Sequence, residues 1–211
     1  MNITLSEWME AADHEVECRR WRDNSRPGKY KFFIKQETIR GYTKEQFHWY
    51  FRNLDSETYR LWHPAHKHIM WVDKYGDTPT HIAWERINGK LAAYCVRMGG
   101  DMANAPMVPD SMKDKNPRLT EFLDTQGKPY FWTVSTEEET QDGFLLTDCF
   151  IFPEGCPDEF VEAHRKHAVE EIPGLAYNAI PALLKKMFGY MPDDETIRKY
   201  PSILVSTDLD N

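Results

Sequence analysis

The chain has 211 residues, 41% hydrophobic residues and a formal net charge of −8, so it is long enough to form one domain with a hydrophobic core. The acidic balance argues against a nucleic-acid-binding protein, because such surfaces need clustered Lys and Arg. Four dispersed cysteines without a CxxC pair, a polar start and the lack of an apolar run of ~20 residues indicate a reduced, cytoplasmic protein without a membrane span.

The first part of the chain is predicted to be mainly helical. Helices are expected over residues 5–17 and 44–53, and Thr43 with Gln46 forms a capping box for the second of them. A further short helix follows. Residues 22–39 are predicted to be irregular or only weakly stranded.

The middle of the chain predicts an antiparallel sheet, because short segments rich in aromatic and β-branched residues alternate with turn signals. Asn88-Gly89 is the strongest hairpin signal, and Asp142-Gly143 offers another turn. Residues 99–116 form a long loop, either at the rim of a pocket or as a plain surface excursion. The predicted strands span residues 69–72, 81–87, 90–98, 130–136 and 143–152.

A long helix is predicted near the end of the chain. It is capped by Asp158, kinks at Pro173-Gly174 and continues over residues 175–188. This order of elements predicts a single α+β domain over residues 1–211, in which an antiparallel sheet wraps the last helix. We expect an N-terminal helical extension over residues 1–55, a core over 56–190, and a ligand cavity between sheet and helix.

The apolar face of this last helix contains residues that can bind a metal ion. On a helical wheel, His164, His167 and Glu171 all lie within the apolar stripe. A carboxylate that faces a core is costly unless it is paired or bound to a cation. His167 and Glu171, spaced i, i+4, are near enough to share one ion. The alternative partner of Glu171 is a buried arginine or protonated His167.

Further metal-ligating residues gather upstream. Period two places His81 and Glu85 on one face of a predicted strand, where Glu85 either binds the ion or pairs with Arg97 across the sheet. One upstream histidine, Glu85 and the helical pair would form a two-histidine, two-carboxylate site, which suits zinc. The upstream histidines are His63, His66, His68 and His81.

These segments resemble a known family, the zinc-dependent hydrolases of acylated phloroglucinols, namely 2,4-diacetylphloroglucinol hydrolase and phloretin hydrolase. The resemblance runs in order through about residues 59–181, in the segments YRLWHPAHKH, HIAWERINGK, GFLLTDCFIF and EAHRKHAVEEIPGLAYNAIP. It implies a helix-grip, Bet v 1-like fold. It also implies a Zn²⁺-dependent enzyme that hydrolyses the carbon–carbon bond between an acyl group and a polyphenolic ring.

The resemblance also implies individual roles. Glu85, His167 and Glu171 would be zinc ligands, and Tyr59 would hydrogen-bond the substrate. A one-residue shift after WHP leaves either His66 or His68 as the remaining ligand, and we favour His66. A family histidine before the GFLL segment has no counterpart, since Glu137, Glu138 and Glu139 occupy that region. The proton transfer, or the substrate, is therefore expected to differ.

The expected reaction needs a proton on the ring carbon before the bond breaks, because an aryl carbanion is a prohibitive leaving group. Water activated by zinc would then attack the acyl carbonyl. Tyr59 would orient a phenol, while Tyr130 or a glutamate such as Glu138 would transfer the proton. The expected partner is an acylated polyphenol, and a homodimer stays open. Alternative functions are a ferrous-iron oxygenase acting on phenols and a non-catalytic binding module for hydrophobic small molecules.

Overall fold

Seven antiparallel strands form one curved sheet in a computed structural model that describes residues 3–200. Strands β2 to β7 follow one another across the sheet, and β1 pairs with β7 at the far edge. Residues 1, 2 and 201–211 of the expected domain lie outside the described part. The strands are β1 Tyr30–Arg40, β2 His66–Asp73, β3 Thr80–Ile87, β4 Lys90–Gly100, β5 Arg118–Leu123, β6 Pro129–Thr140 and β7 Gly143–Pro153.

Two of these strands differ from the sequence-based prediction. Strand β1 is a regular 11-residue strand that pairs with β7 along its whole length, so of the two predictions for residues 22–39 the stranded one is correct, and the strand is stronger than predicted. Strand β5 was not predicted at all. The segment 1–55, expected to be a helical extension of the core over 56–190, thus also contributes a strand to the core sheet. The edge position explains the weak signal of β1, since Phe32 and Ile34 are exposed and no clean alternation results.

The helices largely follow the local sequence signals. Both capping-box hydrogen bonds between Thr43 and Gln46 are present. The first helix runs further than predicted, and Pro157 takes the cap position in place of Asp158. The helices are α1 Leu5–Asp23, α2 Lys44–Asn53, α3 Ser56–Trp62, α4 Asp158–Gly174, α5 Ile180–Phe188 and α6 Asp194–Lys199, with short 3₁₀ turns over Met102–Asn104 and Asp110–Met112.

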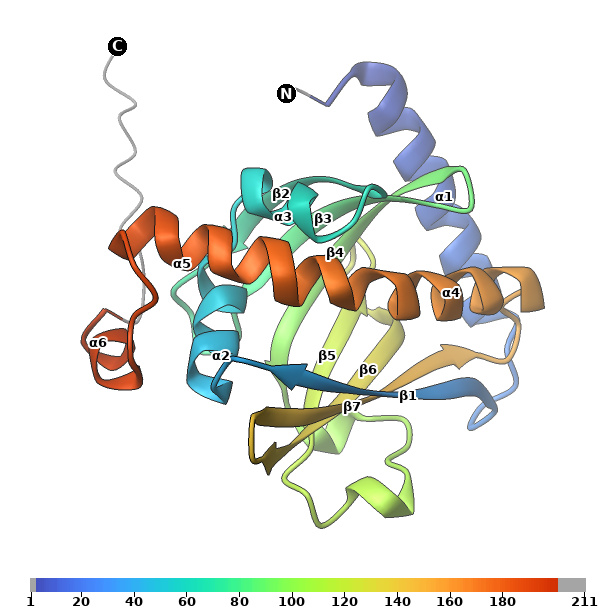
Figure 1. Cartoon of the computed structure of the whole chain (residues 1–211). Coiled ribbons are helices and arrows are strands. Elements are labelled where there is room, and N and C mark those ends of the chain that lie inside the picture. Colours follow the sequence, from blue (N-terminus) through green and yellow to red (C-terminus); the bar gives the residue numbers. More distant parts are fainter. Residues whose placement is uncertain (1–2, 201–211) are drawn as a thin grey trace.

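The long helix crosses the concave side of the sheet. Figure 1 shows α4 and α5 as one path in front of the strands, and α4 packs against both β1 and β3. At the predicted kink the path continues as a π-helical turn over Leu175–Ala179. Gly174 is required there, because a Cβ at this position would lie 1.8 Å from the backbone oxygen of Trp62. The expected α+β helix-grip arrangement is confirmed.

The predicted hairpin between β3 and β4 is confirmed and fixes the register of the site. Asn88 and Gly89 both have positive φ, 50° and 78°, as a two-residue type I′ turn requires. The turn pairs Ile87 with Lys90, and Glu85 then lies opposite Ala92. Glu85 therefore faces the concave side, together with Ala83 and Ile87.

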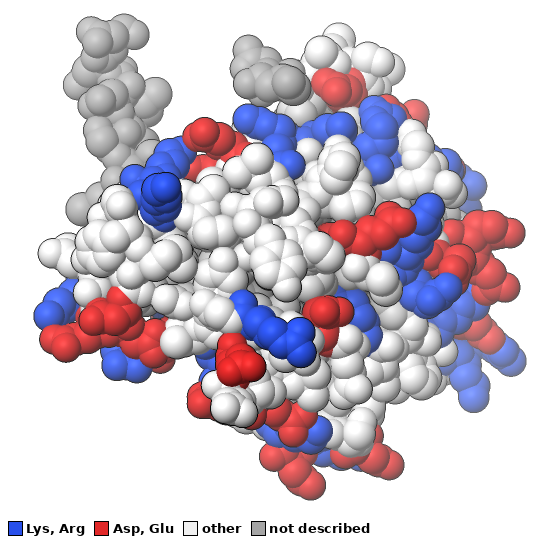
Figure 2. Space-filling model, viewed as in Figure 1, with Lys and Arg blue, Asp and Glu red and all other residues white. Residues whose placement is uncertain are grey.

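The charges on one face of the molecule form no large basic patch. Basic and acidic side chains intermingle on the face shown in Figure 2, in keeping with a net charge of −8. Within residues 3–200, no helix combines the length and apolar character needed to cross a bilayer.

Candidate metal centre and ligand cavity

Four predicted ligands from three elements come together on the concave side. His66 begins β2 and pairs with Glu85 on β3, while His167 and Glu171 project from α4. The Nε2 atoms of His66 and His167 lie 3.1 Å apart. An Oε2 atom of Glu171 lies 3.6 and 3.5 Å from these two nitrogens, and the two oxygens of Glu85 each lie 3.8 Å from one of them.

A β-bulge selects His66 over His68. The register between β2 and β3 shifts between these two residues, so that His66 pairs with Glu85 but His68 pairs with the adjacent Trp84. The extra residue turns the two histidines to opposite faces of the sheet. His68 Nδ1 lies 2.8 Å from Ser56 Oγ, away from the cluster.

The separations within the cluster fit a zinc ion. Zinc binds nitrogen and oxygen ligands at ~2.0–2.2 Å, which puts ligand atoms roughly 3.3–3.6 Å apart in a tetrahedron. The measured separations of 3.1–3.8 Å bracket that range. His66, His167 and Glu171 alone already offer atoms that all lie within 4.8 Å of one another.

The electrostatics of the cluster favour a bound cation. Burial raises the pKa of Glu85 to about 7. Burial also raises the pKa of Glu171, against the opposing effect of Lys35 and with help from Glu85. Burial lowers the pKa of His66 to about 2 and of His167 to about 3. Burial thus disfavours the charged carboxylates, which a bound cation would stabilise, and it keeps the imidazoles neutral, as a metal ligand needs.

Arginine partners of the two glutamates are absent from the described residues, whereas the other alternative, His167 beside Glu171, is present at 3.5 Å. Arg97 donates to Glu121 at 2.7 Å, so the expected alternative pairing with Glu85 was wrong. No described arginine contacts Glu171. Instead, Tyr59 donates its hydroxyl to Glu85 and stacks its ring on His66 at 4.2 Å.

The other histidines have separate environments. His164 donates from Nδ1 to the Phe160 carbonyl and accepts at Nε2 from the Tyr94 hydroxyl, so its role is structural. His63 lies beside the cluster, with its ring 4.5 Å from that of His167. His81 is buried against Trp71 in the cavity wall, as the period-two pattern predicted for its face.

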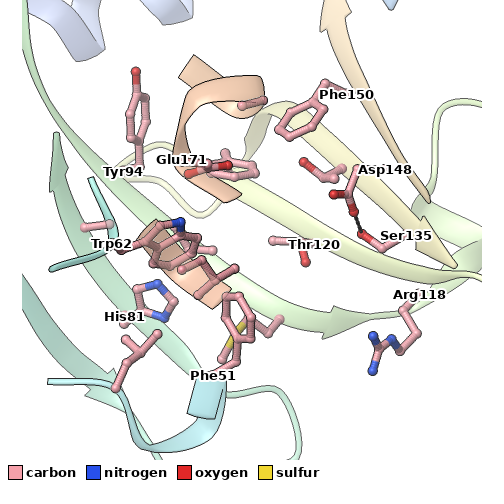
Figure 3. A pocket seen from close by; sticks show the side chains of 18 of the residues that line it. Phe51, Trp62, His81, Tyr94, Arg118, Thr120, Ser135, Asp148, Phe150 and Glu171 are labelled. Carbon is pink, nitrogen blue, oxygen red and sulfur yellow. Dashed lines mark hydrogen bonds between the residues drawn. The ribbon is translucent and has the colours of Figure 1, made fainter. Parts of the chain in front are cut away.

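The cluster opens into a cavity of about 510 Å³ between the sheet and α4. Glu85, His167 and Glu171 line this cavity together with Tyr59. Figure 3 shows this cavity from close by, with aromatic rings around it and a few polar groups pointing inward. A volume and lining of this kind suit a small, mainly apolar molecule. The aromatic lining includes Phe51, Trp62, Tyr94, Phe122, Phe131 and Phe150.

Two predicted catalytic residues do not line the cavity. Tyr130 is buried where the register of β6 shifts against β5, with its ring near Tyr94 and Phe131 and outside the cavity lining. Glu138 also faces away and accepts a hydrogen bond from Lys115 at 2.7 Å. Phe131, Thr133 and Ser135 are the β6 residues that line the cavity, so the structure does not bring Tyr130 or Glu138 to it.

The polar lining residues that the sequence analysis missed include a hydrogen-bonded pair. Ser135 on β6 and Asp148 on β7 both line the cavity, and Ser135 donates to Asp148 at 2.6 Å. The signal for Asp148 was its place between Leu146 and Phe150 at period two, which predicts an acid on an apolar face.

Comparisons with known proteins give no family for this chain. No family model and no curated protein match it. Similar solved structures include Ara h 8.0201, with 12% identity over 70% of this chain and 96% of that one at a TM-score of 0.47. Protein NE0264 from Nitrosomonas europaea has 11% identity over 75% of this chain and 97% of that one, at a TM-score of 0.45. A START superfamily protein from Mycobacterium smegmatis has 15% identity over 75% of this chain and 98% of that one, at a TM-score of 0.40. At these values we draw no conclusion about function from them.

Proposed function

We propose that the protein is a zinc-dependent hydrolase that cleaves the carbon–carbon bond between an acyl group and a polyphenolic ring. The observation that carries the proposal is the cluster of two imidazoles and two carboxylates, with atoms 3.1–3.8 Å apart, at the wall of an aromatic-lined cavity. The resemblance to acylphloroglucinol hydrolases supplies the reaction. That resemblance implies the same four ligand residues, with His66 as the favoured upstream histidine.

The four side chains would hold the ion through two nitrogens and two carboxylate oxygens. When bound, zinc supplies a Lewis acid that activates water and polarises the acyl oxygen. Tyr59 fixes Glu85 through its hydroxyl and fixes His66 by ring stacking, so both ligands keep their orientation. The expected contact of Tyr59 with a substrate phenol remains part of this proposal.

The cavity walls would orient the ring and limit access of bulk water. Phe131 and Phe150 belong to the aromatic lining, which favours an aromatic substrate. The proton for the ring carbon has to come from a group that lines the cavity. Tyr130 and Glu138 do not meet that condition.

A binding module for a hydrophobic small molecule is the second candidate function. The cavity itself supports it, because an apolar space of about 510 Å³ is sufficient for binding without any chemistry. A pure carrier should contain no stoichiometric zinc. The two candidates are therefore separated by the metal content of the protein as isolated.

The first experiment is elemental analysis of the purified protein with a matched pair of variants, His66→Ala and His68→Ala. We expect about one zinc per chain in the parent and in His68→Ala, and a large loss in His66→Ala. The pair is matched because both residues are histidines of β2, on opposite sides of one bulge. Equal metal content in the two variants would reject the site.

The second experiment measures the reaction. The protein is incubated with 2,4-diacetylphloroglucinol, with and without a chelator, and the released acetic acid is quantified. We expect release that stops on complete metal removal and returns with zinc. Release that persists without metal would sink the metal-dependent mechanism, and no release from metal-loaded protein would favour the binding module.

A further inference from the structure

A row of polar residues crosses four adjacent strands of the sheet that faces the candidate metal ligands. Strand pairing places Arg118 of β5 opposite Ser135 of β6, Ser135 opposite Asp148 of β7, and Asp148 opposite Lys35 of β1. Ser135 and Asp148 occupy the middle of this row and line the cavity. Figure 3 shows the two joined by a hydrogen bond on the sheet wall, with Glu171 on the helix side.

The carboxyl of Asp148 is only partly satisfied by the protein. Its Oδ1 accepts from Ser135 Oγ at 2.6 Å. Its Oδ2 lies 3.8 Å from Lys35 Nζ, beyond hydrogen-bonding distance, and Lys35 donates instead to the Ala168 carbonyl at 2.8 Å. Among the described residues no hydrogen bond reaches Oδ2. The Asp148 side chain, which lines the cavity and is 12% exposed, thus keeps an acceptor oxygen to which a ligand hydroxyl can donate.

The neighbouring acid on β6 is not in this situation. Glu137, two residues beyond Ser135 on the same face of β6, bonds to both His48 and Arg118. Its acceptor capacity is already used. Asp148 lies between Leu146 and Phe150, which line the same cavity and offer no donors.

We propose that Asp148, held in place by Ser135, accepts a hydrogen bond from a hydroxyl group on an aromatic ligand bound in the cavity. This pair would give the cavity its preference for hydroxylated rings over plain apolar ones. The inference rests on the proposed function for the ligand class. Hydroxyl recognition, however, requires neither metal nor bond cleavage, so it can be tested separately.

The test compares two ring ligands of the same shape, 1,3,5-trihydroxybenzene and 1,3,5-trimethylbenzene. Neither carries an acyl group, so neither can be cleaved. Binding to the full-length protein as purified is measured by calorimetry or by quenching of tryptophan fluorescence. The variants are Asp148→Ala and Ser135→Ala. Thr147→Val is the matched control, because Thr147 adjoins Asp148 and loses a hydroxyl that accepts from Gln36 outside the cavity lining.

We expect Asp148→Ala to bind trihydroxybenzene roughly tenfold more weakly, since a hydrogen bond to a charged acceptor is lost. Its affinity for trimethylbenzene should stay level or rise. Ser135→Ala should show a smaller loss with the same selectivity, and Thr147→Val should show none. If Asp148→Ala does not fold, the inference is tested by Ser135→Ala alone, through its change in affinity for trihydroxybenzene relative to trimethylbenzene.

Equal losses for the two ligands, or an unchanged affinity for trihydroxybenzene in either folded variant, would overturn the inference. Asp148 would then serve only as a structural partner of Ser135 and Lys35. A failure of acid release in the hydrolysis assay leaves this result untouched, so the failures of the two proposals are distinguishable.

Discussion

Replacing Tyr59 with Phe removes the hydroxyl that donates to the candidate zinc ligand Glu85 and leaves the aromatic ring in place. Tyr59 is only 2% exposed, and its ring lies nearly parallel to that of His66, at an interplanar angle of 9°. The variant therefore keeps the stacking and loses only the hydroxyl that donates to Glu85. A hydrogen bond to a charged acceptor contributes about 1.5–3 kcal/mol. Loss of a residue that hydrogen-bonds to a metal ligand typically weakens metal binding about 10–100-fold, which corresponds to the same range of free energy.

The control is Tyr94→Phe. Tyr94 is also a 2% exposed tyrosine, but its hydroxyl donates to His164, which is not part of the cluster. Zinc affinity is measured by competition with a chromophoric chelator at fixed pH. We expect the 10–100-fold loss in Tyr59→Phe and no comparable change in Tyr94→Phe. Equal affinities in the two variants would show that the Tyr59–Glu85 hydrogen bond does not support the site.

Three further predictions concern stability. Zinc at about 100 times its dissociation constant should raise the free energy of unfolding by ~2.7 kcal/mol, and an unchanged melting temperature would contradict a folded-state site. Burial alone would raise the pKa of Asp124, but hydrogen bonds from Arg22 and nearby backbone amides bring it below its usual value. The ionised Asp124 therefore stabilises the fold at pH values above the ordinary pKa of an aspartate, and this contribution is lost as the pH falls through the lowered pKa. Asp124→Asn should lower the free energy of unfolding by about 1.5–3 kcal/mol at pH 7 and by less near pH 3, and parallel pH profiles would refute this. Gly174→Ala should destabilise by about 1–3 kcal/mol in urea unfolding because its Cβ would meet the Trp62 carbonyl, whereas helix propensity alone predicts a gain.

The local signals in the sequence were sufficient for several elements. The Thr43 capping box, the Asn88-Gly89 hairpin and the inward face of the last helix all depend on residues within a few positions of one another. Such signals do not need the rest of the chain. They placed His167 and Glu171 on one face, and the period of two along β3 placed Glu85 toward the cavity.

Only the tertiary structure decided the parts that depend on strand pairing. The bulge between His66 and His68 arises from the register of β2 against β3, and no periodicity in β2 alone distinguishes the two histidines. The pairing of β6 with β5 and β7, including the register shift at Tyr130, leaves Tyr130 and Glu138 outside the cavity lining. The partly unsatisfied Asp148 became visible only once β1, β6 and β7 were aligned. Register is set by contacts between residues far apart in the chain, so it is fixed by the folded sheet as a whole and not by any one segment.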